Sequence, residues 1–245
     1  MNERIKRLRN SSFEAVPGIS IERALLETEF YKAHYGKYSM PVMRARFFKF
    51  LCDKKTIFIG SDELIVGERG PFPKSVSTFP ELNCHTAEDL RILNGRDMTP
   101  FRISEEEINV FESEVLPAWE GRSMRDRVFD QVPDNWSDAY KSGFFTEFME
   151  QRAPGHTTLD GTIYTKGMND FKREISQSLS TLDYLNVPEA SEKAEQLKAM
   201  DIACDAVILF AERHADLAEK MAQTEDSDVR KKELLNICRV CRRVP

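Results

Sequence analysis

Residues 188–221 read PEASEKAEQLKAMDIACDAVILFAERHADLAEKM, with small or apolar residues recurring every three or four positions. The members of this stripe are Leu197, Met200, Cys204, Ile208, Ala211, Ala215 and Ala218. Because 3.6 residues complete one helical turn, the spacing predicts a long helix with one apolar side. A further helix is expected over 229–240. The chain is therefore predicted to be mainly α-helical.

Two more helices are expected near the start of the chain. Ser20 can cap a helix that runs to Tyr35, and Gly36 permits the left-handed backbone with which helices commonly end. Pro41 then opens a helix over 41–52. The broad apolar face of this helix is predicted to be core, and its members are Val42, Phe47, Phe48, Phe50 and Leu51.

The stretch 56–67, TIFIGSDELIVG, predicts the only β-structure. Two short β-prone runs flank Gly60-Ser-Asp-Glu63, the pattern of a short β-hairpin. From Gly70 to Cys84 prolines dominate, which favours an irregular, extended segment. The predicted fold class is therefore mainly α with a short β-hairpin.

Ser104-Glu-Glu-Glu107 is a capping box that opens a helix toward Leu116, and Pro117 is expected to interrupt it. No sequence repeat and no Ser/Gly-rich linker divides the chain. We therefore treat 1–245 as one α-rich unit.

Composition excludes several classes of function. Of the 245 residues, 41% are hydrophobic and 10% aromatic, enough for a substantial core. A net charge of -6 provides no basic surface of the kind that neutralises nucleic-acid phosphates. No run of 18 apolar residues occurs, and the first ten residues are charged where a secretion signal would be apolar. We expect no nucleic-acid partner, no membrane segment and a cytoplasmic location.

Cys238-Arg-Val-Cys241 is a candidate metal or redox site, because thiolates two residues apart can bind zinc. Only Cys84-His85 could complete a tetrahedral set. On a helix the same spacing also serves plain packing, and we favour that interpretation. The five cysteines are odd in number and scattered, so reduced thiols and no bound metal are expected.

The stretch 143–156, GFFTEFMEQRAPGH, is the strongest candidate for a functional segment. Pro154 and Gly155 would end a helix and leave His156 on a turn, where its imidazole could face a pocket or merely bond a backbone carbonyl. The aromatic residues could be core or a substrate wall, and these are Phe144, Phe145 and Phe148. Glu147 and Glu150 could serve as acid-base groups but are more simply surface glutamates. No Walker loop, dinucleotide-binding glycine motif, His-Glu-x-x-His or hydrolase elbow occurs.

Several blocks, taken in order, resemble the opening of glycyl radical enzymes of the pyruvate formate lyase-like family. They are 19–24 (ISIERA), 28–32 (TEFYK), 41–45 (PVMRA), 62–67 (DELIVG), 79–81 (FPE) and 145–156 (FTEFMEQRAPGH). The last two are most similar to the trans-4-hydroxy-L-proline dehydratase branch. The resemblance covers essentially the whole chain.

This resemblance implies a fold in which the chain supplies N-terminal helical wrapping for a ten-stranded α/β barrel. In the family an S-adenosylmethionine-dependent activating enzyme places a radical on a C-terminal glycine, and a cysteine then abstracts hydrogen from substrate. The last glycine here is Gly167, and no cysteine lies in a Gly-Cys-x-Glu loop. We therefore expect residues 1–245 to be the N-terminal part of a pyruvate formate lyase domain without its glycine radical domain. The chain alone is expected to be inactive and to bind no cofactor.

His156 and Phe148 match a histidine and a phenylalanine that line the substrate pocket of the dehydratase branch, and His156 could protonate the leaving group. Arg152 could clamp a carboxylate, although an ion pair with Glu147 or Glu150 is the simpler interpretation. The family also implies a small-molecule substrate, the radical activating enzyme as a partner, and a homodimer at full length. The alternatives are a non-catalytic scaffold that pairs with a separately encoded remainder, and a helical metal-binding protein.

Overall fold

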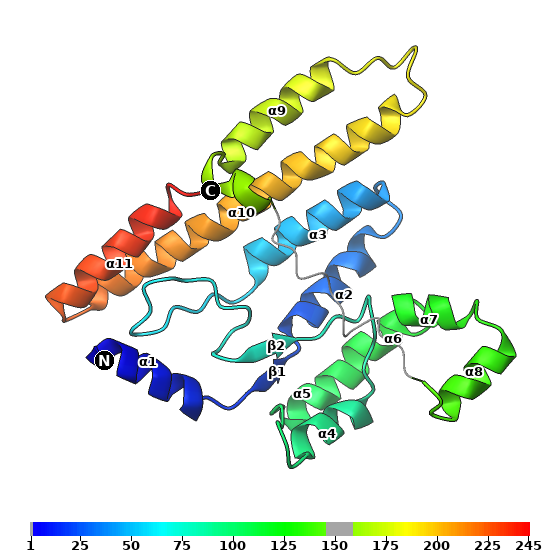
Figure 1. Cartoon of the computed structure of the whole chain (residues 1–245), viewed down its shortest axis with the longest axis horizontal. Coiled ribbons are helices and arrows are strands. Elements are labelled where there is room, and N and C mark those ends of the chain that lie inside the picture. Colours follow the sequence, from blue (N-terminus) through cyan, green and yellow to red (C-terminus); the bar gives the residue numbers. More distant parts are fainter. Residues whose placement is uncertain (1, 146–158) are drawn as a thin grey trace. The chain divides into compact units, whose positions relative to one another are not determined.

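The computed structural model describes residues 2–145 and 159–245, and most of them are helical (Figure 1). It divides into two compact units. Unit 1 comprises Met1–Ala15, Glu29–Ser75 and Gly161–Pro245, and unit 2 comprises Val16–Thr28 and Val76–Asp160. The sequence was expected to form one unit. Composition does not reveal this division, because the chain passes from one unit to the other inside a helix at residues 28–29 and inside a strand at residues 75–76.

Unit 1 is organised around one long helix. This is α10 (Ala190–Thr224), and it packs against α3 (Met40–Lys54), α9 (Met168–Ser180) and α11 (Asp228–Cys241). Figure 1 shows α9 and α11 running beside successive lengths of α10. The expected helices over 188–221, 41–52 and 229–240 are thus confirmed, with ends displaced by a few residues.

The buried surface of α10 is broader than the predicted stripe. Cys204, Ala215 and Ala218 are buried as expected, but Met200 is exposed. The further buried residues on this helix are mostly alanines, and they are Ala190, Ala194, Ala199, Ala206, His214 and Ala222. Small side chains let neighbouring helices approach α10 from more than one side. The buried surface of α10 therefore includes residues outside the single predicted stripe.

Aromatic packing joins α3 to the end of α2 (Glu22–His34). Phe30, Met43 and Phe47 form a buried cluster in unit 1, with Phe50 and Leu51 packed against it. Phe48 is exposed, which corrects its predicted place in the core. The backbone amide of Glu22 lies 3.4 Å from Ser20 Oγ, and Gly36 has a φ of 75°, so both predicted ends of this helix are confirmed.

No β-hairpin forms over 56–67. The two-stranded sheet pairs β1 (Gly18–Ser20) with β2 (Ser75–Ser77) instead. Arg230 of α11 donates to the carbonyl oxygens of Gly60 and Glu63, at 2.8 Å and 2.7 Å. Ile59 is buried in a core cluster with residues of α10 and α11. Helical side chains therefore provide the backbone partners and the apolar contact that a second strand would have provided.

Unit 2 contains most of the short helices. In chain order these are α4 (Ala87–Gly95), α5 (Glu105–Val110), the π-helical turn η1 (Phe111–Val115), α6 (Leu116–Trp119), α7 (Met124–Phe129) and α8 (Asp134–Lys141). The helix does not stop at Pro117. In η1 the amide of Leu116 donates to the carbonyl of Phe111, and this wider turn admits the proline without ending the helix. The apolar side chains of Phe111 and Val115 are fully buried there.

The remaining elements are α1 (Glu3–Glu14) in unit 1 and the 3-10 turn η2 (Asp160–Tyr164). Along residues 2–145 and 159–245, none of the helices combines the length and apolar character needed to cross a bilayer.

Removing the cap of α5 tests the local origin of that helix. Ser104 Oγ accepts from the Glu107 amide at 3.2 Å, and Glu107 Oε2 accepts from the Ser104 amide at 3.0 Å. We expect Ser104→Ala to lower the free energy of unfolding by about 1 kcal/mol, measured by urea denaturation. Ser113→Ala, at an exposed serine in the following turn, is the matched control. Equal stability of the two variants would contradict a capping role.

Candidate functional site

The two residues assigned to substrate, Phe148 and His156, lie outside the described residues. The same is true of Glu147, Glu150 and Arg152. What the structure describes is the protein immediately before this stretch, in unit 2. The part of the candidate segment that the structure describes is thus its N-terminal end, Gly143 to Phe145.

An aromatic cluster lies at that N-terminal end. The ring centroid of Phe145 lies 4.8 Å from that of Trp136 and 6.3 Å from that of Tyr140. Phe129 meets Trp136 and Tyr140 edge-on, at 5.3 Å and 4.9 Å. Phe144, in contrast, is 87% exposed. Of the two phenylalanines of the candidate segment that the structure describes, only Phe145 therefore packs against other rings.

The turn after α8 directs Phe145 back onto this cluster. Gly143 has a φ of 74°, a left-handed conformation that favours glycine. The amide of Phe144 donates to the carbonyl of Ala139 at 3.0 Å, which closes the end of the helix. Trp136 and Tyr140 are four residues apart and share one face of α8, so both rings can meet Phe145.

Arg125 of α7 ties the two helices together. Its guanidinium lies over the Phe129 ring at 4.3 Å, and Nη2 donates to the hydroxyl of Tyr140 at 3.0 Å. Cation–π contact and a charge-assisted hydrogen bond both favour this single arrangement. This cluster was not predicted from the sequence, although the four-residue spacing of Trp136 and Tyr140 is typical of two side chains on one face of a helix.

The start of α7 rests on the block 79–81. The amides of Met124 and Arg125 donate to the carbonyls of Glu81 and Leu82, at 2.8 Å and 3.0 Å. A capping box between Ser123 and Asp126 completes this helix start. The segment that precedes α4 thus sets the position of α7.

Glu81 is in turn held by Arg23 of α2. The two Nη atoms of Arg23 donate to both carboxylate oxygens of Glu81, at 2.6 Å and 3.0 Å. Nη1 also donates to Glu27 at 2.8 Å, and the Phe79 ring lies 4.1 Å from the guanidinium carbon. Burial and a hydrogen bond to Glu81 raise the pKa of Glu27 to about 9. This group was not predicted from the sequence, because Glu27 and Glu81 are far apart along the chain and meet only when it is folded.

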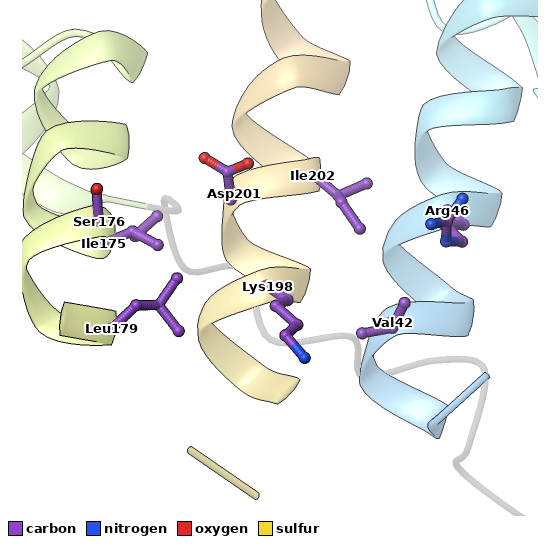
Figure 2. A pocket seen from close by; sticks show the side chains of 8 residues that line it. All are labelled: Val42, Arg46, Ile175, Ser176, Leu179, Lys198, Asp201 and Ile202. Atoms are coloured by element: carbon purple, nitrogen blue, oxygen red, sulfur yellow. The ribbon is translucent and has the colours of Figure 1, made fainter. Parts of the chain in front are cut away.

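A cavity of about 400 Å³ lies in unit 1, among α3, α9 and α10 (Figure 2). It is lined by Val42, Arg46, Ile175, Ser176, Leu179, Lys198, Asp201 and Ile202. Its charged groups already have partners: Lys198 donates to Glu195, Asp201 accepts from Lys172, and Arg46 lies over the Tyr38 ring. None of the lining residues is one that the sequence analysis assigned to substrate. The cavity therefore does not replace the candidate segment as the site.

The cysteines are packed rather than clustered. Cys238 is buried in the core between α10 and α11, with Cys241 packed beside it, as the packing interpretation predicts. Burial raises the pKa of Cys241, and it raises that of Cys84 to about 11. Within the part of the chain that the structure describes, no three His, Cys, Asp or Glu side chains gather as a metal site.

Comparison with known proteins places the chain in a family. The model of the pyruvate formate lyase-like family matches residues 1–245. The trans-4-hydroxy-L-proline dehydratase of Clostridioides difficile is 46% identical over 243 residues, which is 99% of this chain and 31% of that protein. The isethionate sulfite-lyase of Oleidesulfovibrio alaskensis is 30% identical over 258 residues, all of this chain and 30% of that protein.

Solved structures of the same family have a similar fold over this part of their chains. The crystal structure of the Clostridioides difficile hydroxyproline dehydratase with trans-4-hydroxy-L-proline bound matches with a TM-score of 0.93 and 45% identity, over 100% of this chain and 31% of that one. The glycerol-bound B12-independent glycerol dehydratase of Clostridium butyricum matches with a TM-score of 0.88 and 27% identity, over the same shares. The chain thus spans about 31% of the length of these relatives. The fold expected from the resemblance is confirmed, and the chain belongs to the pyruvate formate lyase-like family.

Proposed function

We propose that these residues belong to a glycyl radical dehydratase that removes water from trans-4-hydroxy-L-proline or a related small hydroxylated substrate. The observation that carries the proposal is the 46% identity to the hydroxyproline enzyme along 99% of the chain. A sulfite-lyase of the same family is 30% identical over a similar span. The higher sequence identity to the hydroxyproline enzyme than to the sulfite-lyase favours the hydroxyproline branch of the family.

His156 and Phe148 are the residues of this chain that we assign to substrate. Phe148 contacts the apolar part of the substrate, and His156 donates a proton to the departing hydroxyl group. The carbon–oxygen bond breaks, the hydroxyl group keeps the bonding electron pair, and the proton from His156 completes a water molecule. In this family a glycyl radical, installed by a radical S-adenosylmethionine enzyme, supplies hydrogen abstraction through a cysteine that removes the hydrogen from substrate.

The aromatic cluster at Phe145 supports this assignment. Phe145 precedes Phe148 by three residues and is held by Trp136 and Tyr140. The packing of Phe145 on α8 holds the residue that directly precedes 146–158, and substrate contacts are most effective when rigid elements support them.

The mass and activity of the native protein test the proposal. An antibody against 183–198 suits its capture, because Tyr184 and Leu185 there are exposed. We expect a product much heavier than 28.3 kDa that, once activated without oxygen, consumes trans-4-hydroxy-L-proline faster than glycerol or isethionate. We also expect the 245-residue chain alone to turn over none of the three.

Two outcomes would count against the proposal. A heavy, activated product that prefers glycerol or isethionate would move the substrate to another branch of the family. A native product of 28.3 kDa without turnover would favour the non-catalytic scaffold that pairs with a separately encoded remainder.

A further inference from the structure

Two carboxyl groups in unit 2 converge on one cation. Arg23 donates to Glu27 Oε2 at 2.8 Å and to both carboxylate oxygens of Glu81, at 2.6 Å and 3.0 Å. The Glu27 side chain is 1% exposed and that of Arg23 is 15% exposed. Among the described residues, Arg23 also donates to the carbonyl of Thr78, at 3.3 Å, and lies over the ring of Phe79.

The charges of this group do not balance without a proton. Two ionised carboxylates and one guanidinium would leave one net negative charge largely out of water, and burying an unbalanced charge is costly. Glu27 and Glu81 meet at one nitrogen, because Arg23 Nη1 donates to Oε2 of both, at 2.8 Å and 3.0 Å. Two ionised carboxylates this close repel each other, and a proton on one of them removes the repulsion and supplies a donor. Over the described residues, Arg23 and Glu81 supply the charges that act on Glu27.

Glu27 binds that proton more tightly than Glu81 does. Glu81 is 28% exposed and takes the two-pronged interaction with Arg23, which favours its ionised form. Glu27 is 1% exposed and receives a single hydrogen bond from Arg23. Burial, the largest cause, and the bond to Glu81 raise the pKa of Glu27 to about 9, so the proton remains in place at neutral pH.

We propose that Glu27 is a neutral carboxylic acid that donates its proton to Glu81, and that this shared proton is a pH-sensitive latch that holds the segment 78–82 on α2. The interaction between Glu27 and Glu81 also affects the position of α7. The carbonyls of Glu81 and Leu82 accept the amides that begin α7, and α7 carries Arg125 of the aromatic cluster. Deprotonation of Glu27 weakens the contact on which this part of unit 2 is built.

The sign of the pH dependence follows from the direction of the shift. The pKa of Glu27 is raised above its ordinary 4.5 to about 9 in the folded chain. The stabilising contribution is therefore complete below 4.5 and is lost as the pH rises toward 9, because the unfolded chain releases a proton that the folded chain keeps. Over this window the unfolding equilibrium constant rises by up to about tenfold per pH unit.

Tryptophan fluorescence can follow the unfolding of unit 2 within the 245-residue chain. The two tryptophans, Trp119 and Trp136, both lie in unit 2. Trp119 Nε1 donates to Thr28 Oγ1 at 2.9 Å, next to Glu27 along the chain. Urea unfolding at pH 6 and pH 8 would be compared for the wild type, Glu27→Gln and Glu29→Gln. Glu29 is an exposed carboxylate on the same helix and is the matched control.

We expect the unfolding constant of the wild type to rise between these two pH values by up to about 100-fold more than that of Glu27→Gln. Glutamine reproduces the shape of a neutral acid and its donor, so the variant keeps wild-type stability at pH 6. Glu29→Gln follows the wild type at both pH values. In the infrared spectrum at pH 7, the wild type shows the carbonyl band of a protonated carboxylic acid that Glu27→Gln lacks.

The opposite results would overturn the latch. Equal pH dependence in the wild type and Glu27→Gln would show that Glu27 does not hold the proton. Failure of Glu27→Gln to fold at pH 6 would show that the site requires a charged carboxylate. Absence of the infrared band from the wild type at pH 7 would overturn the proposal without any variant.

Discussion

Arg230→Met lowers the free energy of unfolding by about 3–5 kcal/mol, the cost typical of removing one partner from a buried, charged hydrogen-bond group. The Arg230 side chain is 10% exposed and donates to the carbonyls of Gly60 and Glu63. It also pairs with Glu233, which Arg4 contacts in turn. Methionine keeps an apolar stem of similar length, so the loss reports the guanidinium rather than a cavity.

Far-UV circular dichroism during urea unfolding measures this effect, because residues 56–67, which Arg230 holds, pack against the helices α10 and α11 of unit 1. Arg239→Met is the control, because Arg239 is on the same helix, is exposed and donates only to Asn236 among the described residues. We expect the control to change stability by less than about 0.5 kcal/mol. Similar small losses in both variants would mean that the segment 56–67 is held by its apolar contacts alone.

His156→Gln is expected to lower kcat by about 100-fold or more in the activated native enzyme, with little change in KM. Glutamine can still donate a hydrogen bond but cannot transfer a proton to the leaving hydroxyl group. The measurement is the initial rate of trans-4-hydroxy-L-proline consumption at saturating substrate. The radical content of each preparation, measured by electron paramagnetic resonance, normalises the rates.

Phe148→Leu separates binding from proton transfer. If Phe148 contacts substrate without taking part in the chemistry, this variant raises KM and leaves kcat nearly unchanged. An unchanged kcat in His156→Gln would remove His156 from the proposed proton transfer. A raised KM with normal kcat would instead reassign His156 to substrate binding.

Helices and their ends were predictable because they depend on local chemistry. The Ser104–Glu107 capping box and the left-handed Gly36 occur where the sequence predicts them. The hairpin at 56–67 was wrong because the partner of that segment, Arg230, lies far along the chain. Pro117 was misjudged for a different reason: proline excludes a regular α-turn, and the π-helical turn before it is an alternative that composition does not reveal.

Some residues of the candidate site could likewise be predicted from the sequence, and others could not. His156 and Phe148 come from a family resemblance in one continuous stretch, so they could be named from the sequence. The group of Arg23, Glu27 and Glu81 could not, since charged residues of these types are usually solvated and the burial of Glu27 appears only in the fold. The Phe145 cluster could be predicted in part, because one helix supplies two of its rings, Trp136 and Tyr140.

The hydrogen bonds of Arg230 can form only late in the synthesis of the chain. Its partners Glu63 and Gly60 are 167 and 170 residues earlier in the chain. At about 5–20 residues per second, these two carbonyls leave the ribosome on the order of 10–30 s before the guanidinium that will bind them. Ile59, which packs against α10 and α11, waits just as long for its apolar neighbours. Residues 56–67 are β-prone and lack their final partners for this time, so a chaperone that covers them during synthesis would protect them from mispairing.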